Sequence, residues 1–243
     1  MTLKNIMINL FFEKENAPRR RIDDIERELS DYFVCPFTIV TIPNEAPSTI
    51  PRITARNSLG NEMLNISQIN LQYIISFSDH GATNAIDFID NYYNVILKLY
   101  NIVKNTLKKE TYYFGITCTI EKEEIDPIKY IKDKHLRSLK ENIDEINLRY
   151  ALVEGDKYYV NTLINNAKEA EIDLAIKPDG NNEINLEILS TSKLKVIKHA
   201  IQASIDVNDR YSFNLDEKYR TSEEEILLII KRQKKKSMNL RRR

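Results

Sequence analysis

The chain has 243 residues, 42% of them hydrophobic and 30% charged, with 36 basic against 36 acidic side chains. This composition predicts a globular protein with a buried core and argues against intrinsic disorder. No apolar run approaches the roughly 20 residues of a membrane-spanning helix, and the five glycines stand apart, which argues against a phosphate-binding loop. We therefore expect no membrane contact and no nucleotide cofactor; more generally, we expect no cofactor.

The first part of the chain predicts a mixed unit of short strands and one helix. Apolar residues alternate over Asn5–Phe12, which predicts a strand with one buried face. A turn at Pro18 with Arg19, Arg20 and Arg21 precedes apolar residues at helical spacing from Ile22 to Phe33. Further strands are expected at 37–42, 52–56, 63–66 and 69–77, with a bulge or turn at Ser67-Gln68 where the inward phase changes.

A long helix is predicted at residues 84–108. Its apolar residues form two adjoining stripes with 3,4 spacing, which together cover about half of the helix circumference. So wide an apolar face must be covered, either by the protein's own sheet or by a second copy of the chain. The residues of the candidate interface are Phe88, Tyr92, Val95 and Leu99.

After a strand at 112–120, the remainder predicts a helical connection and a second β-rich half. Asp126-Pro127 is a helix start signal. Glu154-Gly155-Asp156-Lys157 and Pro178-Asp179-Gly180-Asn181 each predict a hairpin turn. Ser222 and Glu225 form a capping box at the start of a final helix. The expected strands span 147–153, 158–165, 171–176, 183–189 and 201–207.

The expected fold is therefore α+β, mainly antiparallel sheet in two β-rich halves with one long central apolar helix and a C-terminal helix. Its predicted parts are 1–125, 126–146 as a helical connection, 147–220 as a β-meander, and 221–243 as the C-terminal helix with a basic tail. Cys35 and Cys118 each lie in strand-like sequence, so we expect two buried thiols in a reducing compartment. With no signal-peptide pattern at the start, this favours the cytoplasm.

Catalytic and metal-binding patterns are sparse. His80, His135 and His199 have no metal-ligand spacing, and no Cys-x-x-Cys or Gly-x-Ser-x-Gly pattern occurs. The densest group of carboxylates at a strand end contains Asp206 and Asp209, weak candidates for Mg²⁺ or Ca²⁺ whose residue types a strand-ending turn also explains.

Charge is strongly polarised along the chain. The last thirteen residues carry eight basic side chains and no acidic one, which leaves residues 1–230 with a net charge of −8. Cations at a helix C-terminus suit the helix dipole, so this tail needs no partner, but it could also bind nucleic acid or an acidic protein surface. Arg19, Arg20 and Arg21 are a candidate added basic face. The tail candidates are Lys231, Arg232, Lys234, Lys235, Lys236, Arg241, Arg242 and Arg243.

The layout also resembles a known family. Four stretches carry the resemblance: PRITARNSLGNEMLNIS at 51–67, YYFGITCTI at 112–120, LRY at 148–150 and IDVND at 205–209. Their order is similar to that in a sporadically distributed family of uncharacterised bacterial proteins. A Gly-Leu-Arg-Tyr-Ile-Asn type of pattern in that family is met only at Gly115-Ile116. The resemblance implies a bacterial source, patchy occurrence and no assigned catalytic residues.

These observations together predict a non-catalytic binding or interaction protein of a bacterial cytosolic assembly, with a mobile-element or defence association as one option. Its partner would be another protein or a second copy of the chain. A nucleic-acid-binding accessory protein that uses the tail is the first alternative. A metal-dependent enzyme centred on Asp206 and Asp209 is the second.

Overall fold

The structure is a computed structural model that describes residues 1–43, 45–77, 91–138, 142–171, 176–178, 184–186 and 195–241. Its strands are β1 Thr2–Phe12, β2 Thr38–Ile39, β3 Ile53–Arg56, β4 Glu62–Ile66, β5 Asn70–Ser76, β6 Thr111–Glu123, β7 Asn147–Glu154, β8 Tyr158–Glu171, β9 Ile176–Pro178, β10 Ile184–Leu186 and β11 Lys195–Asn208. Its helices are η1 Pro18–Arg21, α1 Ile22–Leu29, α3 Tyr93–Asn101, η2 Ile102–Thr106, α4 Pro127–His135, α5 Arg210–Leu215 and α6 Glu223–Arg241.

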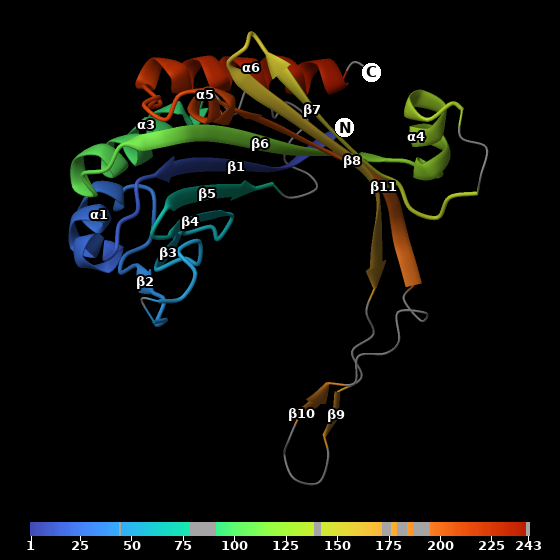
Figure 1. Cartoon of the computed structure of the whole chain (residues 1–243). Helices are drawn as coiled ribbons and strands as arrows, with labels where there is room; N and C mark the ends of the chain where they lie inside the picture. Colours follow the sequence, from blue (N-terminus) through green and yellow to red (C-terminus); the bar gives the residue numbers. More distant parts are fainter. Residues whose placement is uncertain are drawn as a thin grey trace. The chain divides into compact units, whose positions relative to one another are not determined.

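Nine strands form one sheet in the order β2-β3-β4-β5-β1-β6-β11-β8-β7, and β9 pairs with β10 in a separate ribbon (Figure 1). The pairings from β2 to β1 are antiparallel, with Ile8 opposite Tyr73 and Ile53 opposite Ile66. The α+β class with mainly antiparallel sheet is therefore confirmed. The two predicted β-rich halves do not form separate sheets, because β7, β8 and β11 continue the sheet of the first half beyond β6.

The chain divides into two compact units. Unit 1 comprises Met1–Ile120, Arg149–Leu163 and Ala203–Arg243, and unit 2 comprises Glu121–Leu148 and Ile164–Gln202. In unit 2 the start signal at Asp126-Pro127 is confirmed, since the Asp126 carboxylate accepts a hydrogen bond from the Lys129 N–H at 2.9 Å and α4 begins at Pro127. Each unit contains segments from the predicted first part, 1–125, and from the predicted β-meander, 147–220.

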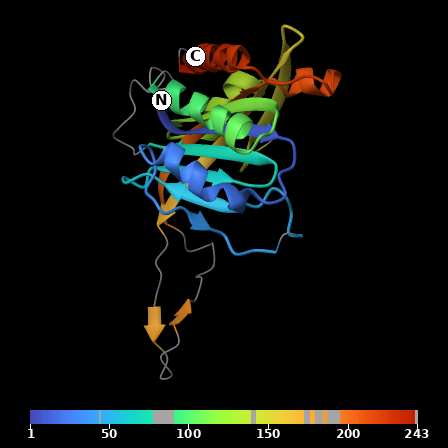
Figure 2. The ribbon, with the colours of Figure 1, turned by 90° about the vertical axis from the view of Figure 1, so that its left-hand side faces the viewer.

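The core of unit 1 lies on one face of its sheet. In β1, Ile6, Ile8 and Leu10 are at most 1% exposed, while Met7 and Asn9 between them are half-buried, as strand alternation requires. We call the face of Ile6 and Ile8 the helix face, because α1, α3 and α6 pack against it (Figures 1 and 2). The opposite face of unit 1 is called the open face below.

The single long helix predicted at 84–108 is not evident. The described helix begins at Tyr93, runs as α3 to Asn101 and continues as the π-helical segment η2 to Thr106. Val95 and Leu99, two of the candidate interface residues, are 3% and 0% exposed within the single chain, while Tyr92 contacts the Tyr73 ring at 6.2 Å. The apolar stripe is thus covered by the protein's own sheet, which corrects the interface reading for those two residues; Phe88 lies outside the described residues.

Several turns form as the sequence predicts. The Ser67 N–H donates to the Asn70 carbonyl at 2.9 Å and turns β4 into β5. Gly155 and Asp156 have φ values of 61° and 49°, a left-handed pair that closes the hairpin between β7 and β8. The Glu225 N–H donates to the Ser222 hydroxyl at 3.3 Å at the start of α6. Across the described ranges, we find no helix with the length and apolar character that crossing a membrane requires.

The two cysteines differ in environment. Cys118 is buried, and burial raises the pKa of its thiol to about 11 even though Gln233 and Ser237 hydrogen-bond to it. Cys35 is exposed, so the prediction of a buried thiol is wrong there, because the segment 34–37 between α1 and β2 is a loop and not a strand.

We expect Ellman's reagent to modify one thiol rapidly in the native protein and the second only on unfolding, because the thiolate is the reactive form and Cys118 is both buried and protonated. Cys35→Ser should abolish the rapid phase and Cys118→Ser should leave it unchanged. Rapid modification of both thiols in the native wild-type protein, or of Cys118 in native Cys35→Ser, would contradict this assignment.

Candidate functional site

The open face of unit 1 contains a groove with a volume of about 540 Å³. It crosses five adjacent strands, from β7 at the sheet edge to β1, a span of about 19 Å at ordinary strand spacing. This volume is in the range of small-molecule sites. The lining residues are Asn9, Phe11, Tyr113, Gly115, Thr117, Arg149, Ala151, Tyr159, Asn161, Asp206, Asn208, Arg210 and Asn214.

Gly115 creates space at the centre of the groove. A Cβ atom at this position would lie 3.0 Å from the Asn208 Cβ and 3.4 Å from an Asp206 carboxylate oxygen. The first distance is shorter than nine in ten real Cβ contacts, so a larger residue at this position would require the Asn208 side chain to shift. Because Gly115 has no side chain, the polar side chains of β11 can form the floor of the groove.

Asp206 organises that floor. One carboxylate oxygen accepts a hydrogen bond from the Thr117 hydroxyl at 3.2 Å, and the other accepts from the Asn161 and Asn208 amides at 2.8 and 2.6 Å. The side-chain amide oxygen of Asn208 in turn accepts from the Arg210 backbone N–H at 3.2 Å. These hydrogen bonds fix the orientation of the amides before a ligand binds. Binding therefore costs less side-chain conformational entropy.

A row of amides continues the polar surface across the sheet. Asn65 donates to Gln72 at 3.3 Å, and Gln72 donates to Asn9 at 3.2 Å, which links β4, β5 and β1 on the open face. Asn9 also lines the groove. This row gives the open face directed hydrogen-bond donors and acceptors in place of charged or apolar side chains.

An aromatic wall closes one side of the groove. The Phe11 and Tyr113 rings stack at 4.4 Å with an interplanar angle of 22°, and the Phe213 ring lies 5.7 Å from Tyr113. The Arg210 guanidinium lies 5.6 Å from the Tyr113 ring centroid. Burial raises the pKa of Tyr113, so its hydroxyl remains a protonated donor. Because these rings stack on one another, they form a wall rather than a free platform for stacking bases.

Two arginines of the groove have no carboxylate partner. Arg149 and Arg210 line it from β7 and from the start of α5, and both are exposed. Within the part of the chain that the structure describes, neither guanidinium forms an ion pair, and the Asp206 carboxylate is bound by neutral donors. The groove thus holds two uncompensated cations on a polar, pre-oriented floor.

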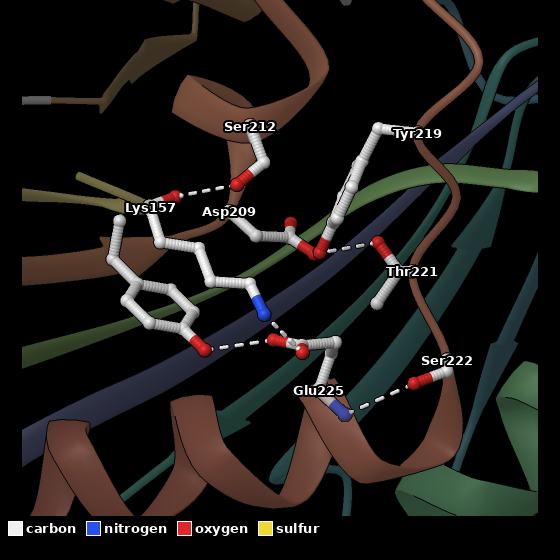
Figure 3. Close-up of polar contacts among 8 residues, drawn as sticks. Lys157, Asp209, Ser212, Tyr219, Thr221, Ser222 and Glu225 are labelled. Atoms are coloured by element: carbon white, nitrogen blue, oxygen red, sulfur yellow. Dashed lines mark hydrogen bonds and ion pairs between the residues drawn. The ribbon is translucent and has the colours of Figure 1, made fainter. Parts of the chain in front are cut away.

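Asp209 fixes the end of β11 and thereby the groove. Asp209 is 0% exposed, and one of its carboxylate oxygens accepts from the Phe114 N–H at 2.7 Å. The other oxygen accepts from the Tyr219 and Thr221 hydroxyls, both at 2.7 Å (Figure 3). Burial raises the pKa of the Asp209 carboxyl, although these hydrogen bonds lower it. Asp209 therefore ties β11 to β6 and to the segment before α6.

A second cluster attaches the β7–β8 hairpin to α6. Lys157 forms an ion pair with Glu225, and the Tyr158 hydroxyl donates to the other Glu225 oxygen at 2.7 Å (Figure 3). Burial, followed by this hydrogen bond, raises the pKa of Tyr158 to about 12. The Ser212 hydroxyl donates to the Lys157 carbonyl at 3.0 Å, which adds α5 to the same anchor.

The predicted basic tail is a helix in its described part. α6 continues to Arg241, and Gln233 and Ser237 on it are buried, with the Gln233 amide donating to the Ile205 carbonyl at 3.0 Å. Arg232 and Lys236 pair with Glu154 at 3.2 and 2.9 Å. Lys231 and Lys235 are exposed, Lys234 is half-buried, and the positions of Arg242 and Arg243 lie outside the described residues.

The other predicted site residues are dispersed. Arg19 donates to the Val40 and Ile42 carbonyls at 2.7 and 2.9 Å and thus secures a loop, whereas Arg20 and Arg21 are exposed. Asp206 and Asp209 have separate hydrogen-bond partners. In the described ranges, no three His, Cys, Asp or Glu side chains are grouped to hold a metal ion.

Sequence reasoning missed most of the groove. Asp206 was singled out, but as a metal ligand, while Arg149, Asn161 and Arg210 were not. The available signal was the alternation of YYFGITCTI and IDVND, in which small or polar residues occupy every second position of two strands. That signal required the adjacency of β6 and β11, which the sequence did not supply.

Comparisons of this chain with protein-family models, with curated proteins and with solved structures found no match. The layout resemblance to uncharacterised bacterial proteins therefore remains a prediction. Function has to be argued from the groove.

Proposed function

We propose that this chain is a non-catalytic binding protein whose groove on the open face holds a small organic anion. The observation that carries the proposal is the pair of uncompensated guanidinium groups, Arg149 and Arg210, beside the amide floor organised by Asp206. Arginine binds carboxylate and phosphate oxygens in bidentate fashion, and oriented amides bind the polar body of the same molecule.

The lining supports binding more than catalysis. Asp206 is the one carboxylate among the groove residues, and three donors already occupy its oxygens. Among the described residues, the lining contains no histidine, cysteine, lysine or serine that could pair with it as nucleophile or base. A fixed network of this kind favours recognition of a shape, not proton transfer.

Isothermal titration calorimetry can test the proposal with matched pairs of probes. Glucose 6-phosphate and AMP carry the anion, and glucose and adenosine are their neutral parents. We expect at least one anion to bind while its parent does not. Arg149→Ala with Arg210→Ala should weaken that binding at least about tenfold, because each charge-assisted hydrogen bond contributes roughly 1.5–3 kcal/mol.

Arg20→Ala with Arg21→Ala is the matched control, since it removes the same charge from exposed positions away from the groove. Its affinity should equal that of the wild type. Equal binding of anions and neutral parents, or equal loss in the two double variants, would overturn the groove as an anion site.

Membership of a bacterial cytosolic assembly stays a proposal that rests on the sequence. Nucleic-acid binding through α6 is the weaker alternative, because Arg232 and Lys236 are engaged with Glu154. Removal of 231–243 is a poor test of it, since Gln233 and Ser237 are part of the buried core. Charge changes at Lys231 and Lys235 are better suited.

A further inference from the structure

The two edges of the nine-stranded sheet are protected to different degrees. At one edge, β2 has only two residues, which is a common way to prevent further pairing. At the other edge, β7 has eight residues, none of them lysine, proline or glycine. Natural edge strands are usually short, charged or covered. β7 is long, and of its two charged residues Glu154 is paired with Arg232 and Lys236, so only Arg149 adds an unpaired charge to this edge.

The apolar side chains of β7 are exposed as well. Tyr150, Leu152 and Val153 are 39%, 53% and 45% exposed, and no other strand of the described sheet has three exposed large apolar residues. Tyr150 and Leu152 project to the helix face, and Val153 to the open face, because Arg149 and Ala151 line the groove. Both sides of an added strand would thus meet apolar surface.

Free backbone groups on β7 face outward. The Asn166 N–H donates to the Ile146 carbonyl at 3.3 Å, so residue 146 is a hydrogen-bonded position opposite β8. Alternation in an antiparallel ladder then directs the N–H and C=O groups of Arg149, Ala151 and Val153 away from β8. β7 is the last strand in the sheet order, and among the described residues these three form no backbone hydrogen bond outside the strand pairings.

The surroundings of this edge are cationic. At the end of β7, Lys231, Arg232, Lys235 and Lys236 of α6 line a cavity of about 290 Å³ together with Leu228 and Glu154. Glu154 is the one acidic residue among the described residues that line this cavity. Its pKa is lowered, chiefly by the hydrogen bond from Lys236. Lys231 and Lys235 are exposed and form no ion pair with other described residues. Four cations thus face one carboxylate beside an unpaired edge.

We infer that β7 is a docking edge to which a protein partner adds an extended, acidic strand. Main-chain hydrogen bonds to Arg149, Ala151 and Val153 provide affinity, and acidic side chains beside Lys231 and Lys235 provide specificity. The aliphatic residues of such a strand would pack on the exposed Leu152, and its acidic residues would lie beside Lys231 and Lys235. The docking edge shares Arg149 and Ala151 with the proposed groove, but it uses their backbone N–H and C=O groups, whereas the groove uses side chains on the open face.

Fluorescence anisotropy with a labelled peptide of about eight residues that alternates Glu and Val tests the inference directly. At about 50 mM salt the peptide should bind the full chain, and a peptide of equal charge that alternates Glu and Pro should not, because proline cannot complete the ladder. Val153→Pro should weaken binding at least about tenfold while the protein stays folded, since its N–H points outward and the position is an edge.

Lys231→Glu with Lys235→Glu should weaken binding to a similar degree, and the control Lys14→Glu with Lys218→Glu, also at exposed positions, should not. If the Glu–Pro peptide or an oligo-dT strand binds as tightly as the Glu–Val peptide, the edge is a general polyanion surface and the inference fails. If sedimentation shows a dimer that Val153→Pro dissociates, the occupant is a second copy and the acidic partner is rejected. Absence of any Glu–Val binding also overturns it.

Discussion

Asp209→Ala is expected to lower the free energy of unfolding by about 3–5 kcal/mol, because two buried donors and one half-buried donor lose their acceptor together. The Phe114 N–H and the Tyr219 and Thr221 hydroxyls all donate to this carboxylate at 2.7 Å, and Asp209 is 0% exposed. Urea unfolding followed by circular dichroism measures the change.

Asp209→Asn is the matched control. The amide carbonyl can still accept from Phe114, and the two hydroxyls can rotate to accept from the amide N–H groups. Its loss of stability should therefore be clearly smaller than that of alanine. Equal losses for the two variants would mean that the carboxylate's hydrogen bonds do not hold the end of β11.

A comparison of the wild type with Asp209→Asn tests how the stability of the fold depends on pH. Burial raises the pKa of Asp209 above its ordinary value of 3.8, so the folded state binds the proton more tightly than the unfolded state. This group stabilises the fold most below pH 3.8, and that contribution is lost as pH rises through the raised folded value. Asp209→Asn should lack this component.

Gly115→Val is expected to abolish binding in the groove. The Cβ alone would lie 3.0 Å from the Asn208 Cβ, and two further methyl groups would occupy the space between β6 and β11. Overpacking of this kind costs about 1–3 kcal/mol of stability, which leaves the protein folded enough for binding to be measured. Calorimetry with the anionic probe that binds the wild type provides the readout.

Gly115→Ala supplies an intermediate step, since it adds only the first carbon atom. A graded loss, with alanine between glycine and valine, would show that space above β6 limits binding. Wild-type affinity in Gly115→Val would place the ligand elsewhere on the molecule.

The sequence predicted local features well where short-range chemistry determines them. The alternation of Ile6, Ile8 and Leu10 identified β1 and its buried face. The caps at Asp126 and Ser222 identified the starts of two helices. These signals depend on residues a few positions apart, so no knowledge of tertiary packing is needed.

Features that depend on strand order could not be predicted. Arg149 and Asp206 are 57 residues apart in the chain and share a groove only because β7, β8 and β11 are neighbours in the sheet. The basic residues of α6 were interpreted as a tail because the sequence alone does not show that Gln233 and Ser237 are buried against β11 and Cys118. The C-terminal helix was predicted, but the burial of two polar residues within its basic stretch was not.

The most direct test of the central claim is the location of the bound anion. Amide chemical shifts of the ¹⁵N-labelled full chain should be followed during titration with the anionic probe that calorimetry selects. The account predicts that the largest shifts fall on Gly115, Thr117 and Asn161, and that they vanish in Arg149→Ala with Arg210→Ala. Shifts confined to α6 or to unit 2, with Gly115 and Asn161 unchanged, would contradict it.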